Sequence, residues 1–155
     1  EGMSIIASDR PDLLEPFLDS EDIELIRSWS RELSVYPESL LLRDLAKFMH
    51  DPTEGGIKGG LAEIQRLSGL GVNLDLDRLP VHPLTRRVVR ELDFDPLHMI
   101  SSGVMLAVLS KDNKKKALDR LEEKGISAAI IGVLVPPGKG EELGTHEELW
   151  KILEL

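Results

Sequence analysis

The stretch His50-Asp51-Pro52-Thr53-Glu54-Gly55-Gly56 decides how this sequence folds, because it joins two segments of different periodicity. The apolar run at residues 45–49 predicts a strand ahead of it. Apolar residues at helical spacing across 57–67 predict a helix after it. We therefore expect a strand, a polar turn and a helix in that order.

The residue types of this turn favour an anion-binding role. A helix N-terminus presents unpaired backbone N–H groups and the positive end of the helix dipole. Gly55 and Gly56 would let an anion approach the backbone, while His50, Asp51 and Thr53 would hold a second group. We predict that these five residues bind phosphate or substrate. In the alternative interpretation, Asp51 only caps the turn, the glycines only permit tight packing, and the histidine is a hydrogen-bonded structural residue.

A second turn, Ser101-Ser102-Gly103, stands directly ahead of the apolar run 104–109, which is typical of a buried strand. Its hydroxyls and a free N–H would line the same cleft as the first turn, although a plain turn fits the residues equally well. If the cleft is shared, Asp51 and Thr53 lie beside Ser101–Gly103 at one end of the sheet.

Composition limits the classes of function. The 155 residues suit one domain, and 41% of them are hydrophobic. No apolar run approaches the roughly 20 residues of a membrane helix, and nothing in these residues reads as a secretory signal. We therefore expect a cytoplasmic protein without a membrane partner. The net charge of −9 argues against nucleic acid as a partner.

Metal and thiol chemistry find little support in the sequence. The absence of cysteine excludes disulfides, thiolate nucleophiles and zinc–sulfur sites. His82, His98 and His146 are scattered and lack metal-ligand spacing. We therefore predict no metal site within this chain.

Strand-like and helix-like segments interleave irregularly along the chain. Strands are expected at 3–7, 45–50, 72–74, 104–109 and 128–135, and helices at 20–33, 37–44, 56–68, from 83, at 114–124 and at 145–155. This order predicts a single α+β domain in which helices cover a mixed β-sheet.

The first turn also resembles the HDPTxGG signature of the C-terminal domain in the AIR synthase (PurM)-related superfamily. Three further segments are similar, in the same order. Glu1–Ser8 resembles the segment that leads out of the N-terminal domain in the HypE family, Leu79-Pro80-Val81 resembles its LPV stretch, and Ile100–Gly103 resembles its N/S-E-G-x-L turn. Two features depart from that family: Ser102 replaces the usual glutamate, and the family's C-terminal cysteine has no counterpart.

The resemblance implies a PurM C-terminal-domain-like fold across residues 1–155, as a piece of a longer HypE-like enzyme. ATP and Mg²⁺ would be held mainly by the missing N-terminal domain, and the full-length protein would form a homodimer that acts on a small molecule. The chemistry would be activation of an amide or carbamoyl oxygen, or phosphoryl transfer, and the isolated domain would be inactive. The alternative is a binding module that kept the fold without the chemistry. A thiamine-monophosphate kinase-like function fits the turn less well.

Overall fold

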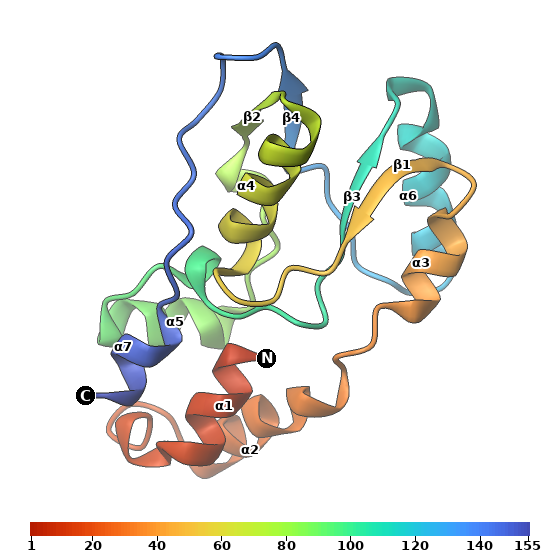
Figure 1. Ribbon diagram of the computed structural model, residues 1–155. Coiled ribbons are helices and arrows are strands. Elements are labelled where there is room, and N and C mark those ends of the chain that lie inside the picture. The colour runs from red at the N-terminus through yellow and green to blue at the C-terminus, as the bar shows by residue number, and fades with distance from the viewer.

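The computed structural model describes residues 1–155 and divides them between seven α-helices and four short strands (Figure 1). The helices are α1 (Gly2–Asp9), α2 (Ser20–Ser28), α3 (Tyr36–Leu42), α4 (Gly56–Ser68), α5 (Pro83–Leu92), α6 (Lys114–Glu122) and α7 (Leu149–Leu153). The strands are β1 (Ala46–His50), β2 (Gly71–Leu74), β3 (Leu106–Leu109) and β4 (Gly132–Val135). Single 3₁₀ turns are η1 (Pro11–Leu13), η2 (Trp29–Arg31), η3 (Leu76–Arg78), η4 (Pro96–His98) and η5 (Lys111–Asn113). None of the helices has the length and apolar character that crossing a bilayer requires.

The strands belong to two similar halves, β1-α4-β2 and β3-α6-β4, and each strand pairs with its counterpart in the other half. β1 pairs antiparallel with β3, and β2 pairs antiparallel with β4. The predicted α+β class is confirmed, but the strands form two separate antiparallel ribbons instead of one mixed sheet. The strand expected over 128–135 is shorter in the structure and consists of β4 alone. A two-stranded ribbon buries little surface, and Val133 of β4 remains 57% exposed.

The segment expected as a strand at 3–7 is instead the helix α1, so that prediction was wrong. Met3, Ile6 and Ala7 are buried at the helical spacing i, i+3, i+4, and they pack within the main core. The hydroxyl of Ser4 donates to the carbonyl of Glu1 at 2.7 Å, which ties the first turn of the helix together. The apolar run was too short for periodicity to separate a strand from a buried helix.

Most other predicted elements are confirmed, with shifts of a few residues at their ends. α3, β1, α4, β2, α5, β3 and α6 all appear where strands and helices were expected. The N-cap of α2 is Asp19, whose carboxylate accepts the Asp22 N–H at 2.9 Å, and Ser20 is the first helical residue. The helix expected at 145–155 is reduced to α7, and residues 145–148 ahead of it are not helical.

The main hydrophobic core joins α1, α2, α5 and α7, which lie together in the lower part of Figure 1. Ile6, Ile26, Val88 and Ile152 are fully buried in this core. Two smaller clusters hold the ribbons, one where α3 and α6 cover β1 and β3 and the other between α4, β2 and β3. The C-terminal helix is therefore part of the same core as the N-terminal helix.

Candidate functional site

Strand pairing brings the two turns to the same end of one ribbon. His50, the last residue of β1, is opposite Leu106, the first residue of β3. Because the strands are antiparallel, the turn that follows β1 and the turn that precedes β3 meet there. The Asp51 carboxylate lies beside the backbone N–H of Gly103. The arrangement therefore places a carboxylate from the first turn against the second turn.

Asp51 is the most chemically unusual residue of this region. Burial raises its pKa, and the nearby Glu1 carboxylate adds to that, whereas the charge of His50 and the N–H of Gly103 lower it. Its Oδ1 is buried and has no hydrogen-bond partner. A buried polar atom without a partner is costly in a folded protein and calls for an explanation. This oxygen is available to a donor or a cation supplied by a ligand.

Gly55 and Gly56 shape the first turn by backbone geometry. Both have positive φ values, 77° and 62°, which side-chain-bearing residues rarely adopt. A Cβ on Gly56 would lie 2.5 Å from the Met99 carbonyl oxygen and 2.6 Å from that of Leu97. The packing interpretation of this glycine therefore has a direct structural basis, in addition to any role in ligand approach.

The hydroxyl groups of the two turns differ in their surroundings. The Ser101 hydroxyl donates to the Met99 carbonyl at 2.6 Å, which stabilises its own turn. The Ser102 backbone N–H donates to a carboxylate oxygen of Glu1 at 3.3 Å. Thr53 is exposed, and its carbonyl accepts the Gly56 N–H at 3.0 Å. Thr53 and Ser102 are thus the residues whose hydroxyls have no partner within the chain.

His50 points toward α4 rather than toward the second turn. Its Nε2 lies 2.7 Å from a carboxylate oxygen of Glu63 on α4, and its ring packs near Phe48. This contact favours a structural role for the ring and leaves His50 as a neighbour of the site.

Sequence reasoning missed Glu147, which connects the two turns. One of its carboxylate oxygens accepts the Gly55 N–H at 2.7 Å. The other accepts the Ile100 N–H at 3.0 Å and the Leu149 N–H at 2.9 Å. The N–H of Gly55 is therefore already paired within the chain. No local pattern identifies such a residue, because its partners are 92 and 47 positions away in the sequence.

A cavity of about 340 Å³ opens beside the second turn. Its lining includes Ser101, the edge-to-face pair of Trp29 and His82, and the carboxyl-bearing residues Glu1 and Glu32. The Leu79–Val81 stretch contributes Pro80 and Val81 to this cavity. The second turn thus forms part of a concave surface with aromatic and acidic walls.

Two histidines that look scattered in the sequence meet in the structure. The rings of His98 and His146 stack with their centroids 3.8 Å apart. His98 is buried and its Nδ1 has no partner, and burial followed by the charge of His146 lowers its pKa. His146 Nε2 lies 3.1 Å from the Glu148 carboxylate. No group of three or more histidine or acidic side chains has an arrangement that could hold a metal ion.

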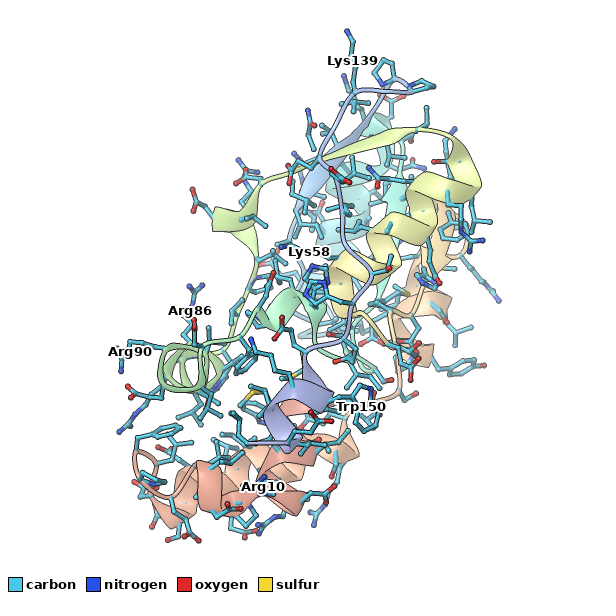
Figure 2. The ribbon with its side chains drawn as sticks, turned by 60° about the vertical axis from the view of Figure 1, so that its left-hand side comes forward. Arg10, Lys58, Arg86, Arg90, Lys139 and Trp150 are labelled. Atoms are coloured by element: carbon cyan, nitrogen blue, oxygen red, sulfur yellow. The ribbon has the colours of Figure 1, made fainter.

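The basic side chains of α4 and α5 differ in their surroundings. Figure 2 shows Arg86 and Arg90 projecting from α5 away from the rest of the molecule. Lys58, on the first turn of α4, pairs with Asp95 at 2.6 Å and so links α4 to η4. The basic side chain that follows the first turn in sequence is therefore already paired with a carboxylate.

Comparison with known families gives a match over most of the chain. The AIR synthase related protein C-terminal domain matches residues 20–144. This chain belongs to that family. The match begins at α2 and ends ahead of α7, so it includes both turns of the candidate site.

Relatives of this AIR synthase related domain include hydrogenase-maturation proteins. It is similar to the carbamoyl dehydratase HypE of Azotobacter vinelandii, with 33% identity over 105 residues, which are 66% of this chain and 29% of the relative. It is also similar to a putative hydrogenase expression/formation protein of Methanocaldococcus jannaschii, with 30% identity over 94 residues, 59% of this chain and 28% of the relative. The chain therefore spans less than a third of the length of these relatives.

Solved structures agree with the fold. The chain is similar to E. coli HypE with a TM-score of 0.74 and 24% identity, covering 97% of this chain and 49% of that one. A crystal structure of the hydrogenase maturation protein HypE in complex with ATP gives a TM-score of 0.63 and 26% identity, covering 74% and 40%. The expected PurM C-terminal-domain-like fold is confirmed.

Proposed function

We propose that this chain is the C-terminal domain of a HypE-like, ATP-dependent enzyme that activates an amide or carbamoyl oxygen or transfers a phosphoryl group. In this proposal the ATP-binding domain is a separate N-terminal part of the parent protein, which acts as a homodimer. The domain described here closes the cleft over the ATP phosphates and a small-molecule substrate. Family membership and the ATP complex of a HypE structure support this assignment.

The observation that carries the proposal is the desolvated carboxylate of Asp51 beside Gly103. Chemistry of this class depends on positioning and on stabilising charge that develops during the reaction. Asp51, Thr53 and Ser102 present groups without partners at the junction of the two turns. Gly55 and Gly56 give the first turn its shape, Ser101 and Gly103 give the second, and His50 borders them.

ATP and Mg²⁺ would be held mainly by the N-terminal domain, and Mg²⁺ would neutralise phosphate charge there. From this chain, the orphaned Oδ1 of Asp51 fits one additional contact, either to a cation or to a donor on the substrate.

The test is ATP turnover by the full-length parent protein with candidate carbamoyl and amide substrates. Asp51→Ala is expected to lower kcat by about 100-fold, the order of effect of removing one electrostatic contact in an active site. Glu54→Ala is the matched control, because Glu54 is an exposed carboxylate in the same turn. Turnover that survives unchanged in folded Asp51→Ala would favour the capping interpretation. A wild-type parent without ATP turnover would favour the alternative, a binding module that kept the fold.

A further inference from the structure

Glu147 joins the two turns of the candidate site through a single carboxylate. One oxygen accepts the N–H of Gly55 in the first turn, and the other accepts the N–H of Ile100 at the start of the second. The contact is made at both turns at once, at 2.7 and 3.0 Å. One side chain therefore ties the two turns to each other, in addition to the pairing of β1 with β3.

The backbone of Glu147 is held firmly from both sides. On one side His146 stacks on His98, and on the other Leu149 and Ile152 are buried in the main core at 2% and 0% exposure. The Glu148 N–H also donates to the His98 carbonyl at 3.1 Å. The carboxylate thus reaches the turns from an anchored segment, which makes it a rigid spacer.

The chemistry of the contact needs a carboxylate. Both oxygens accept hydrogen bonds from backbone donors, and a carboxylate has two equivalent acceptors, whereas an amide replaces one of them with a donor. A negative charge beside the N-terminus of α4 also complements the helix dipole. Glutamine at position 147 would keep the hydrogen bond to one turn. Its amide N–H would face the backbone N–H of the other turn, and that second hydrogen bond would be lost.

We propose that Glu147 is a positioning residue that fixes the separation between the two turns, so that docking of α7 becomes a condition for a working site. The inference rests on the proposed function for its catalytic consequence. The separation matters because Asp51 belongs to the first turn and its neighbour Gly103 to the second. A wider separation of the two turns would move the Asp51 carboxylate away from Gly103 and the other groups of the second turn.

The structural test uses the 155-residue chain, which has no cysteine, so that Ser102→Cys gives a single attachment point for a nitroxide. Paramagnetic broadening of the Gly55 amide by this label reports the gap between the turns. In Glu147→Gln the broadening is expected to fall, and hydrogen exchange of the Gly55 or Ile100 amide is expected to quicken at least tenfold. Unchanged broadening and exchange in the folded variant would overturn the proposal.

Glu141→Gln is the matched control for this test. The Glu141 carboxylate also accepts a backbone N–H, that of Leu74 at 2.7 Å, but it belongs to the β2–β4 ribbon and not to either turn. Glu141→Gln removes the same kind of hydrogen bond, and it is expected to leave the hydrogen exchange of the Gly55 and Ile100 amides and the broadening of the Gly55 amide unchanged. Equal effects from both variants would mean a general loss of stability and would also overturn the positioning role.

The catalytic test uses the full-length parent protein. Glu147→Gln is expected to lower kcat at least tenfold per folded molecule and to leave the KM for ATP unchanged, because the nucleotide is held by another domain. A widened gap with unchanged kcat would overturn the positioning role and leave the proposed function standing. A parent without any ATP turnover would overturn the proposed function and its catalytic consequence here. The spin-label and exchange results would still decide whether Glu147 fixes the gap.

Discussion

Gly56 lies so close to Met99 that a Cβ atom on the glycine would be 2.5 Å from the Met99 carbonyl oxygen. The contact joins the start of α4 to the segment that leads into the second turn. Because Gly56 also has a φ of 62°, both its conformation and its surroundings exclude a side chain. This relationship explains one glycine of the signature by its backbone conformation and its packing.

Gly56→Ala is expected to destabilise the fold by more than about 2 kcal/mol, since it combines left-handed strain with a backbone clash. Gly69→Ala is the control, because Gly69 has a similar φ of 70° with open space around it. That control should cost only about 1–2 kcal/mol. Urea denaturation of both variants measures the difference, and equal losses would refute the clash.

Asp51→Asn is expected to raise the melting temperature at pH 7. Burial raises the pKa of Asp51 above its ordinary value of 3.8. Ionisation of this carboxyl therefore lowers the free energy of unfolding as the pH rises above 3.8. The amide carries no charge and removes that cost. At pH 3 the carboxyl is protonated in both states, and the two melting temperatures should converge. Thermal denaturation at pH 7 and pH 3 checks the prediction, which fails if the difference persists in acid.

The wild-type protein is expected to lose stability as pH falls below about 6.5, partly through His98. Burial lowers the pKa of this histidine from its ordinary 6.5, and the charges of His146 and Lys58 lower it further, against the smaller opposing effects of the Asp95 and Glu148 carboxylates. The unfolded chain therefore binds a proton before the folded chain does. His98→Phe keeps a flat ring against His146 and removes this titration. Melting curves between pH 7 and pH 5 should then show a smaller decline for the variant, and an equal decline would exclude His98 as a cause.

Ile152→Ala is expected to cost about 2–5 kcal/mol, as is typical of a fully buried isoleucine. Ile152 is 0% exposed, and its helix α7 packs against α1 in the main core. Trp150→Ala on the same helix is the control, because Trp150 is 57% exposed and should cost much less. Chemical denaturation compares the two. If both losses were small, α7 would not be an integral part of the core.

Local patterns in the sequence predicted most elements and the residues of both turns. The strand that ends at His50, the helix that begins at Gly56 and the proline that opens α5 each depend on neighbours within a few positions. The family resemblance added the correct fold, which no periodicity could supply.

Two kinds of feature could not be read from the sequence. The short run at Gly2–Asp9 fits a strand or a helix, and only its packing against α2 decides for the helix. The Glu147 clamp and the His98–His146 stack join residues that are far apart in the chain. Such contacts follow from tertiary structure, and single positions of a sequence carry no sign of them.

The pairing of β1 with β3 and of β2 with β4 has a consequence for how the chain folds. Neither half contains a hairpin, so no β-ladder can close between neighbouring segments. The first ribbon can form only when Leu106–Leu109 is present, and the second only when Gly132–Val135 is present. During synthesis no ladder can therefore close before residues 106–109 have been made. Since non-local pairing slows folding, closure of the ribbons is expected to be the slow step.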